Sequence, residues 1–265
     1  MKSKYALRFL ALGYLALLLG IPVSLVFVNA FQDGVGAAWA AVTTPEAQHA
    51  FYLTMVMVAV AVPLNTIFGV LCALAVVRQR FRGRALLNAL VDLPFAVSPV
   101  VVGLALLLVY GRRDGWVGGW FAEQGIQIIF STPGMILATM FVSLPFVVRE
   151  VIPVLREIGT EQEQAAATLG AGSLQTFFRV TLPAIRWGVA YGIVLTTARA
   201  LGEFGAVSVV SGQLSGQTET ATLFVANSFQ RFDETGAYAA SVVLALAALV
   251  TLLAMNLIKP KEAEG

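Results

Sequence analysis

Two charged residues stand four positions apart in an otherwise apolar segment near residue 200. Arg199 and Glu203 interrupt a run of small and hydrophobic side chains. A spacing of four places both on one side of a helix, where they can form an ion pair. Charges within a membrane-spanning helix are costly and usually face a protein interior or a water-filled path. Three roles stay open: a structural pair, a gate whose partners exchange, or contact between Arg199 and an anion.

A second apolar segment offers an alternative contact for an anion. Pro94, Ser98 and Pro99 lie within it, and helices broken inside a membrane can direct backbone N–H groups at anions. If an anion crosses the membrane through this chain, we therefore expect its path or gate to involve these three residues together with Arg199 and Glu203.

Catalytic and metal-binding chemistry has little support. His49 and Cys72 are the only histidine and cysteine, and one of each makes no metal site. Asp92 and Glu203 are the only carboxylates deep in apolar segments, which leaves an intramembrane aspartyl enzyme as an alternative. The phosphate-binding pattern G-x-x-x-x-G-K-[S/T] is absent from the sequence. We expect no enzymatic activity, and no metal or cofactor bound by this chain.

Composition predicts that most of the chain lies in a membrane. Of the 265 residues, 58 % are hydrophobic and 12 % are charged, whereas soluble domains carry about 25 % charged residues. A spanning helix needs about 20 apolar residues, so we predict one all-α, polytopic membrane domain over residues 1–265 with six transmembrane helices. The predicted spans cover residues 9–30, 51–77, 86–110, 133–155, 187–211 and 238–258.

The distribution of lysine and arginine predicts the orientation. Thirteen of the 17 lie in terminal segments or in loops on one side of the predicted membrane. They are Lys2, Lys4, Arg8, Arg78, Arg80, Arg82, Arg84, Arg149, Arg156, Arg179, Arg186, Lys259 and Lys261. Positive residues favour cytoplasmic loops, so we predict that both termini are cytoplasmic. The net charge of +2 gives no reason to expect a nucleic-acid partner.

A cleaved signal peptide is an alternative interpretation of the first span. Val28-Asn29-Ala30 loosely resembles a cleavage site. The apolar run before it is longer than a typical signal core, which has about 7–15 residues. We therefore expect this segment to be a transmembrane helix.

The segment 156–186, between predicted spans four and five, carries signals for two short cytoplasmic helices. Thr160 and Glu163 have the spacing of a capping box, which predicts a helix from Glu161 to Leu169. Gly170 or Gly172 would supply the left-handed conformation that ends a helix.

A second short helix is expected after this glycine turn. Ser173 would cap a helix from Leu174 to Leu182, and Pro183 would end it, because proline disfavours helical geometry in the preceding residue. The segment is either a docking surface for another protein or a connector that lies flat on the membrane.

Small residues recur every fourth position in the fifth predicted span. Gly188, Gly192, Thr196 and Ala200 would line one stripe of a helix. Small residues at this spacing let helices approach closely. Close packing is the expected role, and a stripe that lines a pore is the alternative.

Residues 164–183 resemble the EAA motif of bacterial ABC-importer permeases. Gln164-Ala165-Ala166, then Gly170, then Leu182-Pro183 have the spacing of that motif. The segments 92–101 and 198–206 are similar to sulfate and molybdate permeases. Within that class, the segments 144–150 and 207–212 are similar to the W-type sulfate/thiosulfate permeases.

This resemblance implies a membrane-spanning subunit of an ATP-driven importer that translocates sulfate or thiosulfate across the bacterial inner membrane. A molybdate or tungstate importer is the alternative, and a membrane scaffold without transport activity is an alternative of another class. The implied partners are a dimer of ABC ATPase subunits that carry ATP and Mg, a sister T-type permease in a heterodimer, an oxyanion-binding protein on the outer side, and membrane lipid.

The resemblance also assigns the residues that couple to the ATPase. They are Gln164, Ala165, Ala166, Gly170, Leu182 and Pro183. Gln164 stands where the family usually has glutamate. Any ionic contact of that glutamate is therefore lost here or moved to Glu161 or Glu163.

Overall fold

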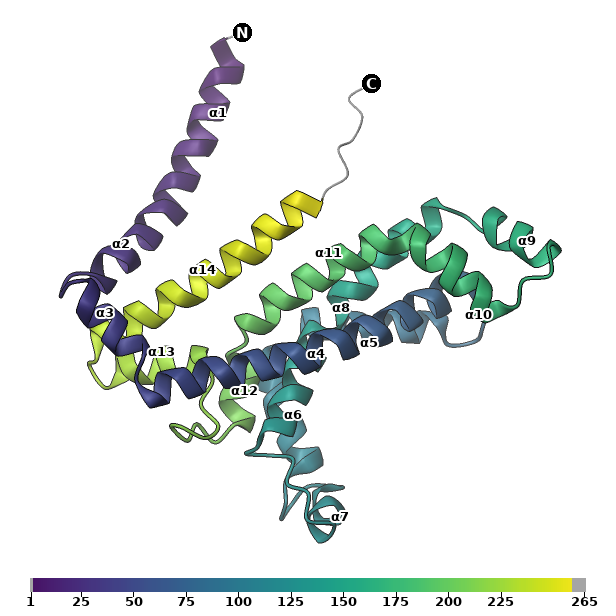
Figure 1. Cartoon of the computed structure of the whole chain (residues 1–265). Coiled ribbons are helices and arrows are strands. Elements are labelled where there is room, and N and C mark those ends of the chain that lie inside the picture. The colour runs from purple at the N-terminus through teal and green to yellow at the C-terminus, as the bar shows by residue number, and fades with distance from the viewer. Residues whose placement is uncertain (1, 259–265) are drawn as a thin grey trace.

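The computed structural model describes residues 2–258, and every regular element in this range is helical (Figure 1). The elements are α1 (Lys2–Leu15), the π-helical turn η1 (Ala16–Gly20), α2 (Ile21–Ala30), α3 (Val35–Val42), α4 (Pro45–Arg78), α5 (Arg84–Ala96), α6 (Pro99–Tyr110), α7 (Gly118–Glu123), α8 (Thr132–Glu157), α9 (Glu161–Thr168), α10 (Ser173–Thr176), the π-helical turn η2 (Phe177–Thr181), α11 (Leu182–Leu201), α12 (Gly205–Val210), α13 (Ala221–Gln230) and α14 (Glu234–Ile258). The all-α prediction is confirmed.

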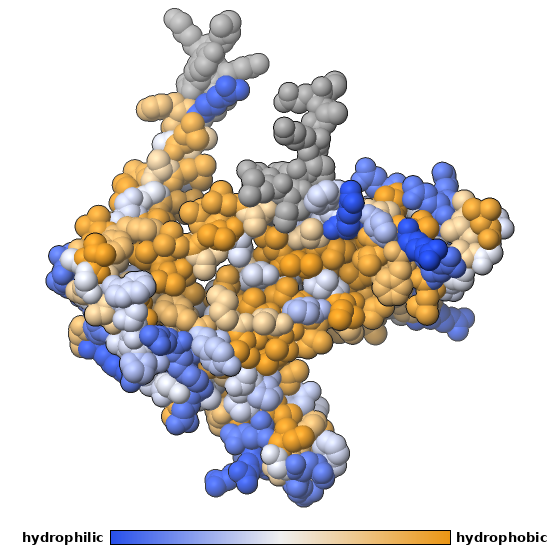
Figure 2. All heavy atoms as spheres, viewed as in Figure 1, coloured by the Kyte–Doolittle hydropathy of each residue, from blue (hydrophilic) through white to orange (hydrophobic). Residues whose placement is uncertain are grey.

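Within the described range, five helical runs are long and apolar enough to cross a membrane, and a bent pair of helices raises the number to six. The five runs cover Arg8–Ala30, Pro45–Arg78, Thr132–Glu157, Ser173–Leu201 and Glu234–Ala254. Hydrophobic side chains cover the flanks of the long helices, whereas hydrophilic residues gather near α9 and α10, near α7 and at the end formed by α3 and α13 (Figure 2). The chain is a multi-pass membrane protein.

The third predicted span is not a straight helix. The direction of the chain bends by 115° between α5 and α6. Helix α6 leaves the body of long helices towards α7 (Figure 1). The break lies at Val97 and Ser98, whose backbones are extended. Proline at residue 99 explains the break, because the residue before a proline avoids helical geometry.

The fifth predicted span, residues 187–211, is also broken. Helix α11 ends at Leu201, and α12 begins at Gly205. A Cβ atom built on Gly205 would lie 2.9 Å from the Pro99 Cβ, and one built on Gly103 would lie 2.8 Å from the Ala206 carbonyl oxygen. The two broken spans therefore pack directly against each other, with α12 against α6.

Helix α8 is the central helix, and α4 and α11 pack against it. A Cβ atom built on Gly192 would lie 2.8 Å from the Val147 Cα, and one built on Gly69 would lie 2.7 Å from the Val147 Cβ. The predicted stripe of small residues, which begins at Gly188, is buried along its whole length. Its packing role is thus confirmed for Gly188 and Gly192, since both face the backbone of α8.

Buried apolar side chains form two clusters along the bundle. One cluster contains Met57, Met135 and Leu223. The other contains Val70, Leu155 and Ile185, closer to the α9–α10 end. Outside these clusters, the apolar window of α1, η1 and α2 buries none of its residues, and α1 diverges from α14 (Figure 1).

Candidate functional site

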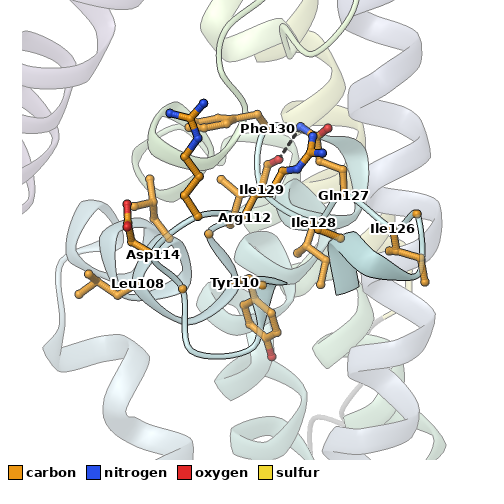
Figure 3. Close-up of a pocket in the computed structure, with 16 residues that line it drawn as sticks. Leu108, Tyr110, Arg112, Asp114, Ile126, Gln127, Ile128, Ile129 and Phe130 are labelled. Atoms are coloured by element: carbon orange, nitrogen blue, oxygen red, sulfur yellow. Dashed lines mark hydrogen bonds between the residues drawn. The ribbon is translucent and has the colours of Figure 1, made fainter. Parts of the chain in front are cut away.

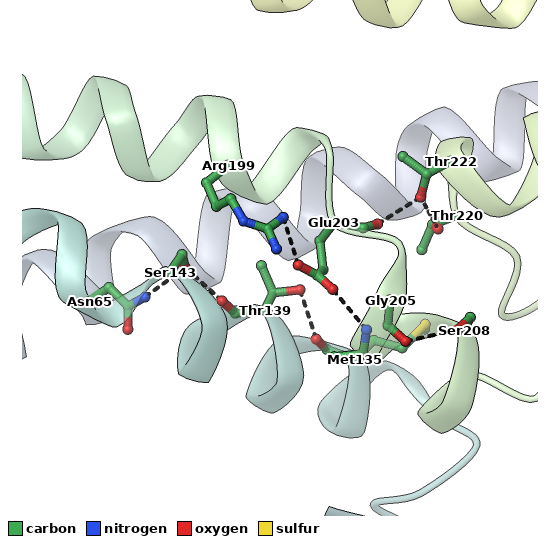
Figure 4. A network of polar contacts seen from close by, with 11 residues as sticks. Asn65, Met135, Thr139, Ser143, Arg199, Glu203, Gly205, Ser208, Thr220 and Thr222 are labelled. Carbon is green, nitrogen blue, oxygen red and sulfur yellow. Dashed lines mark hydrogen bonds and ion pairs between the residues drawn. The ribbon is translucent and has the colours of Figure 1, made fainter. Parts of the chain in front are cut away.

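The predicted ion pair of Arg199 and Glu203 is present. The Arg199 Nη1 atom lies 2.8 Å from the Glu203 Oε2 atom, and the two side chains are 30 % and 1 % exposed. The Ala206 N–H donates to Glu203 Oε1 at 2.9 Å, and the Thr222 hydroxyl donates to the Glu203 carbonyl oxygen at 2.7 Å (Figure 4). The carboxylate therefore bonds both to α11 and to the first turn of α12, across the break between them.

A band of polar side chains lies near this pair, between the two apolar clusters (Figure 4). The Asn65 amide on α4 donates to the Ser143 hydroxyl and to the Met140 carbonyl oxygen on α8, each at 2.9 Å. Ser143 donates in turn to the Thr139 carbonyl oxygen at 2.6 Å. The hydroxyl of Thr196 on α11 is buried and has no hydrogen-bond partner among the described residues. Polar groups from three spans thus meet at one level of the bundle.

The structure brings only part of the second predicted anion contact near this band. Pro99 begins α6 and lies against Gly205, two residues after Glu203. Pro94 is buried within α5, whereas Ser98 is exposed and its side chain does not cap α6. Pro99 is therefore the member of the predicted set that the fold joins to the Arg199–Glu203 region.

A second ion pair, between Asp92 and Arg149, joins α5 to α8. The Arg149 Nε atom donates to Asp92 Oδ1 at 2.7 Å, and its Nη2 atom contacts Asp92 Oδ2. The orientation argument counted Arg149 among the residues of the loops, which was wrong, because Arg149 lies within α8. Its carboxylate partner explains how a charge is tolerated inside this apolar helix.

Glu219 is a buried carboxylate that the sequence analysis missed. The residue is only 1 % exposed. The Asn227 amide donates to its Oε1 atom at 2.5 Å, and its Oε2 atom has no hydrogen-bond partner within the described part of the chain. The polar sequence around it, Ser-Gly-Gln-Thr-Glu-Thr, gave no signal of burial.

The predicted turn between the short helices is confirmed at Gly170, whose φ of 84° is left-handed. The predicted capping box is wrong, since the Thr160 side chain makes no capping bond to α9. Thr160 instead accepts a hydrogen bond from the Gln164 amide at 3.0 Å. The Glu163 carboxylate is held by Arg78 and Thr181, so it does not reach back to the start of α9.

The second short helix differs from its prediction at both ends. It begins at Ser173 with Gly172 at the N-cap position, and no side chain caps it. Pro183 does not end it, because α10, η2 and α11 form one helical run from Ser173 to Leu201. Proline lacks an N–H and crowds the preceding turn, and the wider π-helical turn η2, just before Pro183, accommodates both effects.

A cavity of about 800 Å³ opens between the end of α6, α7 and residues 125–130, which precede α8. Figure 3 shows Arg112, Asp114 and Gln127 around it, and the Gln127 amide donates to the Ile129 carbonyl oxygen at 3.0 Å. None of the predicted site residues lines this cavity. Its lining is part of a loop that joins the broken third span to α8.

Residues 65–263 match the family described as binding-protein-dependent transport system inner membrane component. The chain belongs to this family. It is 53 % identical to the sulfate transport system permease protein CysW of Synechocystis sp., over 98 % of this chain and 94 % of that protein. It is 40 % identical to the sulfate transport system permease protein CysT of Synechococcus elongatus, over 92 % of this chain and 87 % of that protein.

Its fold is similar to that of a bacterial ABC transporter involved in the import of the acidic polysaccharide alginate. The TM-score is 0.80 at 18 % sequence identity, covering 98 % of this chain and 96 % of that chain. This likeness shows the fold alone. The family match and the identity to CysW confirm the expected resemblance to ABC-importer permeases and, within them, to the W-type proteins.

In this permease, the α9–α10 end exposes large apolar side chains. Leu169 is 88 % exposed, Leu174 is 75 % exposed and Phe178 is 61 % exposed. Among the residues that match the EAA motif, Gln164, Ala165, Gly170 and Pro183 are exposed, and Ala166 and Leu182 are half-buried. Four of the six matching residues are therefore accessible at the surface, whereas Leu182 packs against the apolar cluster that contains Val70 and Leu155.

Proposed function

We propose that this chain is the W-type permease subunit of an ATP-driven importer that moves sulfate or thiosulfate across the bacterial inner membrane. The observation that carries this proposal is the similarity to CysW over almost the whole of both chains. The lower identity to CysT favours the W-type role over the T-type role. ATP and Mg would be bound by a separate ATPase subunit, and this chain would have no catalytic site of its own.

The anion would pass the polar band near Arg199 and Glu203. Support comes from three features: two broken spans that meet at Pro99 and Gly205, a buried ion pair, and polar side chains from α4, α8 and α11 at the same level. Pro94 and Ser98 complete the proposed path or gate. Transport would follow when the spans rock between inward-open and outward-open states around this level.

The ATPase dimer would bind the loop between α8 and α11 through Gln164, Ala165, Ala166, Gly170, Leu182 and Pro183. Exposed Leu169, Leu174 and Phe178 support a docking surface, because large apolar side chains gathered at one exposed end of a molecule mark a site of contact with another protein or with lipid. Movement of the ATPase subunits would then displace α9 and α10. Both termini would lie on this cytoplasmic side.

A T-type sister permease would complete a heterodimer, and an oxyanion-binding protein would dock on the outer side. The unburied apolar window of α1, η1 and α2 supports contacts with lipid and with a second permease. The outer face would contain the cavity beside α7 and the ends of α3 and α13.

Uptake of labelled sulfate tests this function. The chain is expressed with its ATPase, sister permease and binding protein in cells that lack a sulfate importer. We expect ATP-dependent uptake that unlabelled sulfate and thiosulfate reduce and molybdate does not. Uptake of molybdate without uptake of sulfate would replace sulfate with a molybdate or tungstate substrate, and a complex that assembles without any uptake would favour a scaffold.

Reporter fusions test the orientation. Fusions near Arg82, Thr168 and Lys261, the last of which lies outside the described residues, should report the cytoplasm, whereas fusions near Gln48, Trp120 and Thr222 should report the outer side. A cytoplasmic signal at Trp120 would overturn the six-span topology, because the segments from α5 to α8 would then have to cross the membrane differently.

A further inference from the structure

Helix α9 has no apolar anchor in the permease. It buries no residue, and the elements that it contacts most, α10 and η2, follow it in the chain. It lies at one end of the molecule, beyond the body of long helices (Figure 1). Since hydrophobic burial does not fix its position, polar contacts must do so.

Glu163 makes these contacts for α9. Its Oε2 atom lies 3.0 Å from the Nε atom of Arg78, and the two side chains are 22 % and 16 % exposed. Its Oε1 atom accepts a hydrogen bond from the Thr181 hydroxyl at 2.9 Å. One carboxylate thus links α9 to the end of α4 and to η2.

The same guanidinium also binds the end of α8. The Arg78 Nη1 atom donates to the Leu155 carbonyl oxygen at 3.0 Å, and its Nη2 atom donates to the Gly159 carbonyl oxygen at 2.5 Å. The last carbonyl groups of a helix have no partner within the helix, and a cation is favourable there. Arg78 therefore connects the ends of α4 and α8, the link after α8, and α9.

Glycines on both sides of α9 make this connection necessary. Gly159 and Gly170 have φ values of 62° and 84°, and a Cβ atom at either would meet nothing within 4 Å. Without a contact to the spans, force applied to α9 would be absorbed by rotation about these two residues. The contact between Arg78 and Glu163 joins α9 directly to α4, so force need not pass through Gly159.

We infer that Arg78 and Glu163 are positioning residues that tie α9 to α4 and α8, so that displacement of the coupling loop moves these two spans together. The inference rests on the proposed function, because the displacing partner is the ATPase. The Asn65–Ser143 hydrogen bond joins the same two helices, α4 and α8, at the polar band. A joint movement of these helices would therefore reach the proposed path of the anion.

The first part of the test examines the tie in the permease alone. Hydrogen exchange of residues 161–168 is compared between the wild type, Arg78→Gln, Glu163→Gln and the control Glu161→Gln. Glu161 is an exposed residue on the same helix. Like Glu163, it lies in the first turn of α9, where a carboxylate is favourable, so the control reports the loss of that charge alone. We expect faster exchange in Arg78→Gln and Glu163→Gln than in this control. Unchanged exchange in Arg78→Gln and Glu163→Gln would overturn the inference.

The second part measures ATP hydrolysed per sulfate transported by the complete importer in liposomes. Hydrogen bonds to charged groups are among the stronger contacts in proteins, so we expect Arg78→Gln and Glu163→Gln to raise this ratio by about tenfold. The amount of bound ATPase should stay within about twofold of the wild type, because the exposed docking surface is unaltered. Arg78→Lys should be intermediate, because an ammonium cannot reproduce the several contacts of a guanidinium.

The outcomes separate the inference from the proposed function. Loss of bound ATPase in the Gln variants would mean that Arg78 and Glu163 only help to fold the docking surface. An unchanged ratio of ATP hydrolysed to sulfate transported would mean that their contact does not transmit movement of α9 to the spans. Either result overturns the inference. A wild-type complex that hydrolyses ATP but moves no sulfate would overturn the proposed function. Exchange of residues 161–168 would then still decide whether the tie exists.

Discussion

Two arginine–glutamate pairs, one at the polar band and one beside α9, have similar distances between their charged atoms but join different parts of the chain. Arg199 and Glu203 are four residues apart and lie 2.8 Å from each other. Arg78 and Glu163 are 85 residues apart and lie 3.0 Å from each other. The first pair bridges a break within one span, whereas the second joins elements that only the fold brings together.

The carboxylates of the two pairs differ most in burial. The Glu203 side chain is 1 % exposed and that of Glu163 is 22 % exposed, whereas the arginine side chains are 30 % exposed for Arg199 and 16 % exposed for Arg78. Removing the partner of a fully buried carboxylate leaves a charge without compensation, but charges that are partly exposed are screened by water. The comparison therefore indicates that the inner pair matters more for stability, and the pair at the end of the bundle more for the position of a small helix.

The largest effect is expected from Arg199→Leu, which breaks the inner pair. It leaves the Glu203 carboxylate, whose side chain is 1 % exposed, without its partner, and we expect a loss of about 3 kcal/mol in stability, measured as thermal denaturation and yield of the assembled complex. Arg199→Leu combined with Glu203→Leu should cost less, because no orphan charge remains. It would still lose the acceptor for the Ala206 N–H, a contribution of about 1 kcal/mol.

The double variant also separates the roles of the inner pair. If Arg199 and Glu203 are purely structural, the doubly substituted permease should assemble and take up sulfate. Full assembly without uptake would place the pair in the transport path. Normal assembly of the single variant Arg199→Leu would contradict the importance assigned to the burial of Glu203.

Gly192→Leu should have the next largest effect, since it disturbs the helix contact that lies between the two pairs. A Cβ atom at this position would already lie 2.8 Å from the Val147 Cα. We expect a loss of about 1–3 kcal/mol from overpacking and a lower yield of assembled complex on size-exclusion chromatography. Gly202→Leu is the matched control, because its Cβ would find its nearest neighbour at 3.7 Å. Equal yields would argue against close packing of α11 on α8.

Glu219→Gln tests whether a buried carboxylate that has no arginine partner among the described residues contributes to stability and transport as Glu203 is expected to. The amide retains an oxygen for the Asn227 donor and replaces the carboxylate oxygen that has no partner with an uncharged NH2 group. We expect sulfate uptake within about twofold of the wild type and an equal or higher melting temperature. A loss of uptake with normal assembly would assign Glu219 a role in transport.

Gln164→Glu should have the smallest effect. Gln164 is exposed, and substitutions of exposed side chains usually change stability by no more than about 0.5 kcal/mol. Its neighbour Glu163 already makes the ionic contact of this helix. Uptake and the amount of bound ATPase should match the wild type, and a marked gain in either would show that position 164 carries an ionic contact of its own.

Much of the fold was predictable because its signals are local. The predicted spans 51–77, 133–155 and 238–258 lie within α4, α8 and α14, since a run of apolar residues must form a helix in lipid whatever its neighbours are. The spacing of Arg199 and Glu203 predicted their contact for the same reason. The left-handed glycine at 170 was likewise one of two positions indicated by the local pattern.

The breaks were harder to predict, because hydropathy does not register them. Residues 97–98 and 202–204 lie in apolar segments, yet each interrupts a span. Pro99 and Gly202 were visible in the sequence, but many transmembrane helices tolerate such residues when neighbouring groups satisfy the backbone. Pro183 illustrates this tolerance, since the helical run passes through it.

The sequence by itself determined the all-helical membrane fold, the family and the local pair at residues 199 and 203, because each depends on composition or on short spacings. Only the tertiary structure decided that Arg78 meets Glu163, that Asp92 meets Arg149 and that Glu219 is buried. Such contacts join residues far apart in the chain, and they exist only after α4, α5, α8 and the coupling loop have packed. The physical reason is that helix packing sets which polar groups lose water, and those groups must then find partners that no local pattern reveals.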